Sequence, residues 1–133
     1  MIYVDANVFI FSATNSEEKG QKSRELVRNI ITGKIKAASS ALTFDEVFWK
    51  VKKERGFDDA LLAAKTFLDM PNLSIIEANE TILAEAYNLI KNYKLDPRDA
   101  IHAASAVVHG ISTIISDDPD FDRIKELKRK VTS

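Results

Sequence analysis

The sequence predicts an α/β fold in which helices cover both faces of a parallel sheet. Four short apolar runs, at residues 2–4, 35–38, 73–76 and 111–115, have the length and composition of strands. None of these runs alternates polar with apolar residues, so each strand is expected to be buried on both faces. The longer segments between them repeat apolar residues with helical spacing, which is typical of an alternating α/β domain.

Residues with capping preferences mark the expected helix boundaries. Gly56 and Gly110 stand where helices should stop, and Pro97 stands at a first helical position. Residues 124–133 carry a Lys-rich pattern that predicts a final, frayed helix. Four residues with N-cap side chains precede helical segments: Thr43, Asp58, Asn79 and Asp96.

Length and composition predict one soluble domain spanning residues 1–133, with 45% hydrophobic and 29% charged residues. No apolar run approaches the roughly 18 residues of a membrane-spanning helix, and the N-terminus lacks the pattern of a secretory signal. We therefore expect a cytoplasmic protein with no membrane partner. The absence of cysteine excludes disulfides and thiolate zinc sites.

The net charge of −1 gives no global basic character, so any contact with nucleic acid has to be local. Basic residues do cluster at Lys34 with Lys36, at residues 50–55 and at residues 125–130. Such runs are more often solvated helix faces than binding sites, and that is the interpretation we favour for each cluster.

Two acidic residues follow predicted strands. Asp5 comes directly after the first strand, at the carboxyl edge where open α/β sheets place ligands, although it fits an N-cap equally well. Glu46 follows the second strand, and its spacing from Thr43 fits a capping box, which is the favoured role when Glu46 is considered alone. Both structural and ligand roles stay open at this point.

More acids occur later in the chain. Asp99 lies in the first turn of a predicted helix, where the helix dipole favours a carboxylate, and chain order alone does not place it beside Asp5. Residues 117–122 hold four carboxylates, more than a turn requires. Carboxylates gathered within ~4 Å repel one another and persist by sharing protons or binding cations. Hard oxygen ligands select Mg²⁺, Mn²⁺ or Ca²⁺, and a chain with only two histidines and no cysteine disfavours zinc.

Four acidic motifs occur in order along nearly the whole chain: residues 3–9 (YVDANVF), 40–46 (SALTFDE), 99–104 (DAIHAA) and 115–121 (ISDDPDF). In these motifs the sequence resembles the PIN-domain family and, within it, the VapC-type toxins of toxin–antitoxin pairs. The resemblance implies a three-layer α/β/α sandwich with a central parallel sheet of four or five strands. It also implies one catalytic pocket formed by Asp5, Glu46, Asp99 and Asp118.

The same resemblance implies that Asp5, Asp99 and Asp118 hold Mg²⁺ or Mn²⁺. In the family's last motif Thr stands where this chain has Ser116, and Asp117 fills a variable position, so Asp117 is the alternate ligand to Asp118. Asn7 and Ser116 are expected to orient the carboxylates. His102 is interpreted as a packed helix residue and is assigned no role.

By this resemblance the protein is expected to be an endoribonuclease that cleaves single-stranded or looped RNA, as the toxin of a type II pair. Glu46 would position or deprotonate the attacking water. One alternative is an RNA-processing PIN nuclease outside a toxin–antitoxin pair, and another is a non-catalytic module that binds RNA or protein. A haloacid-dehalogenase-like phosphatase would need a second Asp two positions after Asp5, where Asn7 stands.

The toxin interpretation also implies two protein partners, a small antitoxin that covers the pocket and a second copy of the chain in a homodimer. Trp49 and Phe57 are candidate interface residues. Trp49 lies off the apolar stripe of its predicted helix, although a second buried face would explain Trp49 equally well.

Overall fold

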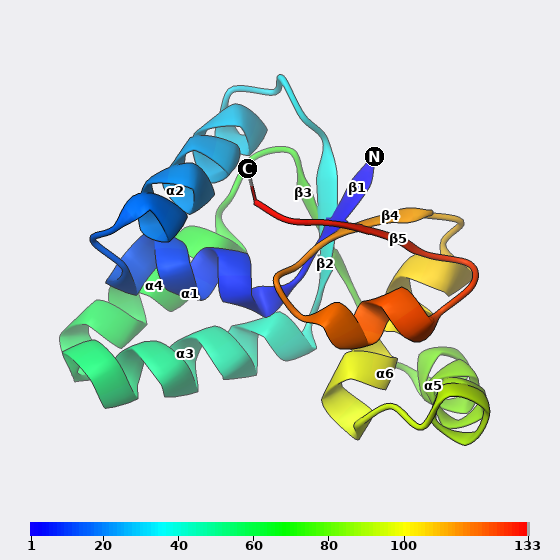
Figure 1. Ribbon diagram of the computed structural model, residues 1–133. Coiled ribbons are helices and arrows are strands. Elements are labelled where there is room, and N and C mark those ends of the chain that lie inside the picture. Colours follow the sequence, from blue (N-terminus) through cyan, green and yellow to red (C-terminus); the bar gives the residue numbers. More distant parts are fainter. Residues whose placement is uncertain (133) are drawn as a thin grey trace.

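The computed structural model describes residues 1–132, which form a parallel sheet between two layers of helices (Figure 1). Its five strands are β1 (Ile2–Val4), β2 (Ala37–Ser40), β3 (Leu73–Ile76), β4 (Thr113–Ile115) and β5 (Lys128–Lys130), in the order β3-β2-β1-β4-β5. Its helices are α1 (Ala6–Thr14), α2 (Glu18–Ile31), α3 (Leu42–Arg55), α4 (Phe57–Leu68), α5 (Glu80–Tyr93), α6 (Pro97–Val108) and the 3₁₀ helix η1 (Pro119–Arg123). The predicted α/β/α architecture is confirmed.

Successive residues of the strands point to opposite faces of the sheet and so feed two separate cores. Tyr3 and Ile114 pack on one face with α5, α6 and η1. Val4 and Ile115 pack on the other face with α1, α2, α3 and α4. Figure 1 shows the same division, with α5 and α6 on one side of the strands and the four earlier helices on the other.

Strand β2 lies two residues later than predicted, because two serines take the place expected of apolar residues. Ser39 and Ser40 are fully buried. The Ser39 hydroxyl donates to the carbonyl oxygen of Val4 at 2.7 Å and accepts from Thr43 Oγ1 at 2.7 Å. A buried hydroxyl with its hydrogen bonds made is tolerated in a core, so the strand continues through residues that the apolar pattern excluded.

The same contact shows that the expected cap at Thr43 is wrong. Helix α3 begins at Leu42, whose N–H donates to Ser40 Oγ at 3.0 Å, and Thr43 is a buried residue of the first turn. No capping box forms between Thr43 and Glu46, and the Glu46 side chain is left available for other contacts.

The remaining boundaries follow the predictions with two small differences. Asn79 caps α5 by accepting from Ile82 N–H, and Asp96 and Pro97 open α6 as expected. Helix α4 begins at Phe57, so Asp58 lies in its first turn and is not its cap. Strand β4 is shorter than expected, because the Ile111 N–H bonds to Ala106 O and closes the end of α6. Helix ends at the two predicted glycines are confirmed, with φ of 93° at Gly56 and 70° at Gly110.

The predicted C-terminal helix is wrong. Residues Lys128–Lys130 form the edge strand β5, which runs parallel to β4. The Arg129 guanidinium donates from Nε and Nη2 to the two carboxylate oxygens of Asp122, at 2.9 and 3.0 Å, and from Nη1 to Ser116 O at 3.2 Å. Charged residues on an edge strand hinder pairing with other chains, and in the sequence they look the same as a solvated helix face.

None of the helices in residues 1–132 is both long enough and apolar enough to cross a membrane.

We expect Ser39→Ala to lower the free energy of unfolding by about 1–3 kcal/mol, because it leaves the Thr43 hydroxyl and the Val4 carbonyl without their buried partner. Chemical denaturation monitored by circular dichroism measures the change. Ser16→Ala, at an exposed position, is the matched control and should stay within about 0.5 kcal/mol. Equal midpoints for the two variants would contradict the role given to the Ser39 hydroxyl.

Candidate functional site

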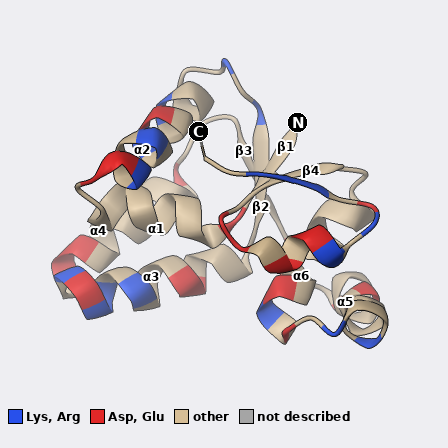
Figure 2. Ribbon diagram, in the orientation of Figure 1, with Lys and Arg blue, Asp and Glu red and all other residues tan. Residues whose placement is uncertain are grey.

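Acidic residues from distant parts of the sequence meet at the carboxyl edge of the sheet. Asp5 directly follows β1, and Ser116 directly follows the neighbouring strand β4. Glu46 lies near the start of α3, and Asp99 lies in the first turn of α6. Figure 2 shows acidic residues in the loop after β4, along η1 and at the start of α6. Asp5 Oδ1 lies 3.5 Å from His102 Nε2, three residues after Asp99 on α6, so the two acids that chain order left apart share this edge.

Asp5 is both a helix cap and a member of this cluster. Its Oδ1 accepts from the N–H of Ala6 at 2.8 Å, and its Oδ2 accepts from the hydroxyl of Ser116 at 2.7 Å. Asn7 Nδ2 donates to the same hydroxyl at 3.4 Å. Burial raises the pKa of Asp5, while the neighbouring His102 and the Ser116 hydroxyl oppose the rise. The cap role considered for Asp5 is confirmed, and its ligand role stays a prediction.

Asp99, Asp118 and Asp120 form the closest group of carboxylates. One carboxylate oxygen from each of the three lies within 4.8 Å of the others. Asp118 Oδ1 also accepts from the N–H of Asp120 at 2.9 Å, so η1 begins with its cap inside the group. Burial, followed by the charges of Asp118 and Asp5, raises the pKa of Asp99 to about 7.

Asp117 and Asp118 point to different partners. Asp118 meets Asp99, whereas Asp117 Oδ2 pairs with Lys19 Nζ at 2.9 Å. Asp120 was not among the expected site residues, although it belongs to the same dense acidic run. Its spacing of two from Asp118 places both at the start of η1.

His102 belongs to the cluster as well, which the sequence interpretation missed. It is buried, as expected of a packed helix residue, at 1% exposure. Its Nε2, however, lies 2.5 Å from Glu46 Oε1 and 3.5 Å from Asp5 Oδ1, and its Nδ1 lies 2.7 Å from the Tyr3 hydroxyl. Burial lowers the pKa of His102, but the Glu46 and Asp5 carboxylates outweigh this and leave it raised. The signal available in the sequence was the position of His102 three residues after Asp99.

The donors of this site suit a hard divalent cation. The oxygens that lie closest together are carboxylate oxygens of Asp99, Asp118 and Asp120, and both His102 ring nitrogens are already hydrogen-bonded within the protein. Asn7 Oδ1 is buried and has no hydrogen-bond partner in residues 1–132, so it can receive a hydrogen bond from a water on such an ion. An open pocket of about 410 Å³ lined by Glu46, Asp96, Pro97, Arg98 and Asp99 gives access from solvent.

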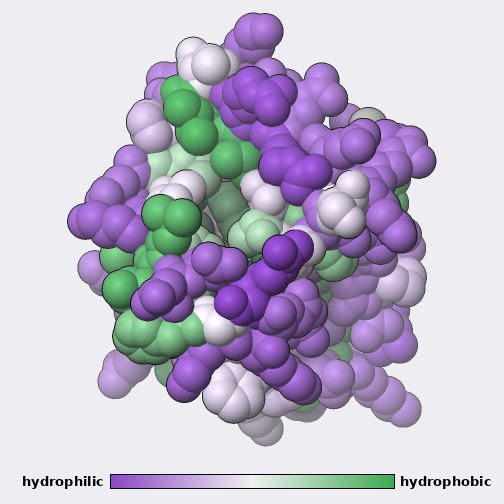
Figure 3. Space-filling model, turned by 90° about the vertical axis from the view of Figure 1, so that its left-hand side faces the viewer, coloured by the Kyte–Doolittle hydropathy of each residue, from purple (hydrophilic) through white to green (hydrophobic). Residues whose placement is uncertain are grey.

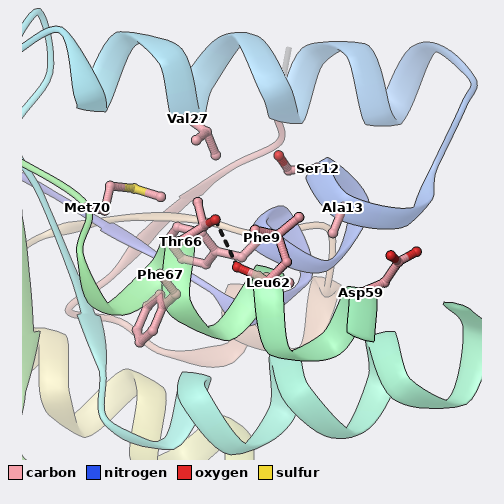
Figure 4. Close-up of a pocket in the computed structure, with 10 residues that line it drawn as sticks. Phe9, Ser12, Ala13, Val27, Asp59, Leu62, Thr66, Phe67 and Met70 are labelled. Carbon is pink, nitrogen blue, oxygen red and sulfur yellow. Dashed lines mark hydrogen bonds between the residues drawn. The ribbon is translucent and has the colours of Figure 1, made fainter. Parts of the chain in front are cut away.

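A second surface feature lies on the side of α1, α2 and α4. A hollow of about 320 Å³ opens between these helices (Figure 4). Figure 3 shows apolar residues gathered around a hollow on this side of the molecule, with hydrophilic residues outside them. The hollow is lined by Phe9, Ser12, Ala13, Val27, Asp59, Leu62, Ala63, Thr66, Phe67 and Met70.

Solved structures with the same fold include two VapBC structures and a VapC toxin. The chain aligns with VapBC2 of Rickettsia felis bound to a promoter DNA fragment, with a TM-score of 0.74, 18% identity and coverage of 98% of both chains. DNA-bound VapBC of Salmonella typhimurium gives a TM-score of 0.76 and 17% identity, over 99% of this chain and 98% of that one. VapC20 of Mycobacterium tuberculosis, a sarcin–ricin loop cleaving toxin, gives 0.76 and 15%, over 92% and 93%. At these identities the likeness shows the fold.

No curated protein sequence matches the chain. The family model described as the PIN domain matches residues 2–127, which include every acidic residue of the cluster. The resemblance of the four motifs, the parallel sheet in its observed order and this match agree. The chain therefore belongs to the PIN-domain family.

Proposed function

We propose that this protein is a divalent-metal-dependent endoribonuclease and the toxin of a type II toxin–antitoxin pair. The observation that carries the proposal is the convergence of Asp5, Asp99 and Asp118 from three separate segments on one edge of the sheet. Membership of the PIN-domain family and the fold shared with VapC toxins support it.

In this proposal Asp5, Asp99 and Asp118 hold Mg²⁺ or Mn²⁺, and Asp120 adds a fourth oxygen donor. The bound ion would lower the pKa of a water and neutralise charge at the scissile phosphate. Asp118 is preferred to Asp117 because Asp117 is already paired with Lys19. The Ser116 hydroxyl, shared between Asp5 Oδ2 and the N–H of Asp118, keeps the two carboxylates in register.

Glu46 serves as the group that orients the attacking water and accepts its proton. It lines the open pocket together with Asp99, so a phosphate that enters the pocket meets both side chains. Single-stranded or looped RNA fits an open pocket better than a duplex does, because its nucleotides can be splayed out to reach the acids. One relative with this fold is described as cleaving the sarcin–ricin loop, which agrees with a looped substrate.

The apolar hollow between α1, α2 and α4 supports an antitoxin partner. Leu62 lines the hollow and is 67% exposed, and the neighbouring Leu61 and Leu68 are 53% and 51% exposed. Exposed apolar side chains around a hollow are typical of a protein-binding surface. The relatives from Rickettsia felis and Salmonella typhimurium are toxins in complex with antitoxins, so a peptide segment of an antitoxin is the proposed occupant.

Single substitutions of the two adjacent aspartates, Asp117 and Asp118, test the proposed metal ligands. Asp118→Asn should lower Mn²⁺-dependent cleavage of single-stranded RNA by on the order of 100-fold or more, because it removes a charged ligand. Asp117→Asn is the matched control and should stay within a few-fold of the parent, because its partner is Lys19. Cleavage by the unmodified protein should also cease on addition of a chelator. Full activity of Asp118→Asn would contradict the proposed ligand set.

The raised pKa of Asp99 predicts that the stability of the metal-free protein depends on pH. With a pKa of about 7 in the folded state against 3.8 as the ordinary value, Asp99 keeps a proton that the unfolded chain releases between about pH 4 and 7. The stability contributed by this group is therefore present below pH 4 and is lost as pH rises through 7. We expect Asp99→Asn, which cannot ionise, to match the parent protein at pH 4 and to melt at a higher temperature than the parent at pH 8.

Differential scanning fluorimetry of metal-free protein checks this pH effect. Asp96→Asn, at the exposed residue that precedes α6, is the control and should not raise the melting temperature at pH 8. A melting temperature of Asp99→Asn below that of the parent at pH 8 would show that Asp99 is not held under charge repulsion.

Exposed aromatic residues on α3 and α4 provide a test of the expected homodimer. Trp49 on α3 is 62% exposed and Phe57 on α4 is 56% exposed, so the second buried face considered for Trp49 is excluded. Trp49→Glu should shift the protein to the 14.9 kDa of one chain in light scattering after gel filtration. Tyr87→Glu, at a residue on α5 that is 67% exposed, should leave the dimer intact. A parent protein that already runs as one chain would remove the dimer.

A further inference from the structure

A continuous chain of hydrogen bonds runs from the sheet through His102 to Glu46. The Tyr3 hydroxyl, on the central strand β1, lies 2.7 Å from His102 Nδ1. On the other side of the ring, Nε2 lies 2.5 Å from Glu46 Oε1 on α3. Tyr3 and His102 are 0% and 1% exposed, so both contacts are shielded from water on the side of the core. Three segments separated by 56 and 99 positions meet in this chain.

The position of the proton on the ring follows from the chemistry of the two partners. A carboxylate oxygen can only accept, so His102 Nε2 must carry a proton to bond with Glu46. In the neutral ring Nδ1 is then an acceptor and receives a hydrogen bond from the Tyr3 hydroxyl. In the charged ring both nitrogens donate, and Nε2–H still points to Glu46. The donor that faces Glu46 is therefore the same in either state of charge.

Glu46 accepts from a side chain of another helix, whereas Asp5 and Asp118 each accept from a backbone N–H close to them in the sequence. Asp5 is held by the N–H of Ala6 and by the Ser116 hydroxyl, and Asp118 accepts from the N–H of Asp120. Within residues 1–132, Glu46 receives its single hydrogen bond from His102. A glutamate also has one more rotatable bond than an aspartate, so an unsupported Glu46 would sample several rotamers.

We infer that His102 is a positioning residue that fixes the Glu46 carboxylate, and that Tyr3 fixes His102. The inference rests on the proposed nuclease function, in which Glu46 handles the attacking water. His102 touches neither substrate nor metal in this scheme. The distance from His102 Nε2 to Asp5 Oδ1 is 3.5 Å, longer than the 2.5 Å to Glu46 Oε1, so the effect on Glu46 dominates.

Two amide variants separate the two sides of the ring. In His102→Gln the amide nitrogen takes the place of Nε2 and can still donate to Glu46, whereas in His102→Asn the shorter amide reaches the place of Nδ1 and leaves Glu46 unsupported. We expect His102→Asn to lower kcat for RNA cleavage by about 10–100-fold with KM changed less than about threefold. His102→Gln should recover most of the lost kcat. His109→Asn changes the exposed histidine at the C-terminal end of the same helix. It is the control and should match the parent in kcat.

A double variant tests whether the effect passes through Glu46. In a Glu46→Gln background, His102→Asn should cause no further loss of kcat, because the carboxylate that His102 positions is already gone. An additional loss as large as in the parent would show that His102 acts elsewhere and would overturn the inference. Equal kcat for His102→Asn and the parent would overturn it as well.

A readout without RNA or metal covers the case in which His102→Asn does not fold. The chain has two histidines, so ¹⁵N-labelled His109→Asn protein shows the ring of His102 alone. We expect its nuclear magnetic resonance spectrum to place a proton on Nε2. Tyr3→Phe, which keeps the ring volume, should weaken the preference for a proton on Nε2. In a separate cleavage assay, Tyr3→Phe should lower kcat several-fold. A bare Nε2 with the proton on Nδ1 would overturn the inference. Failure of the unmodified protein to cleave any RNA would instead overturn the proposed function and, with it, this role for His102.

Discussion

Repulsion among carboxylates is the constraint that shapes the carboxyl edge of this sheet. Hydrogen bonds or a retained proton offset the negative charge of the acids at this edge. Asp5 accepts two hydrogen bonds and faces His102, Asp118 accepts the N–H of Asp120, and Asp99 holds a proton up to a pKa of about 7. A divalent ion held as proposed would offset these charges at once.

The parts of the fold that could be predicted from the sequence are those that depend on apolar patterning alone. Strands β1 and β3 have the predicted bounds, because their runs are largely apolar and the segments that follow them carry clear cap residues. The expected burial on both faces is wrong for β3, an edge strand in which Ser74 and Ile75 are exposed. The errors fall where polar residues play a structural part. Ser39 continues a buried strand by bonding to Val4 O and Thr43, and the charged residues of β5 form an edge strand through the Asp122–Arg129 pair. Such pairings depend on partners that are distant in the sequence.

The candidate site divides in the same way. The motifs predicted Asp5, Glu46, Asp99 and Asp118 as site residues, and in the structure Asp99 lies at the edge that Asp5 occupies. The proposed preference for Asp118 over Asp117 as a ligand rests on the ion pair between Asp117 and Lys19. Lys19 lies on α2, outside the four motifs. The role of His102 could not be predicted, because its helix neighbours are small and apolar and its polar partners, Tyr3 and Glu46, lie on β1 and α3.

The central position of β1 has a consequence for how the chain folds. Its neighbours in the sheet are β2 and β4, and the hydrogen bond between Asp5 and Ser116 joins residues that are 111 positions apart. Closing so long a loop costs conformational entropy before the contact stabilises anything, so a topology of this kind has high contact order and folds slowly. We expect the acidic edge to be completed late in folding, and a growing chain on the ribosome cannot assemble it until Asp118, which follows β4, has emerged.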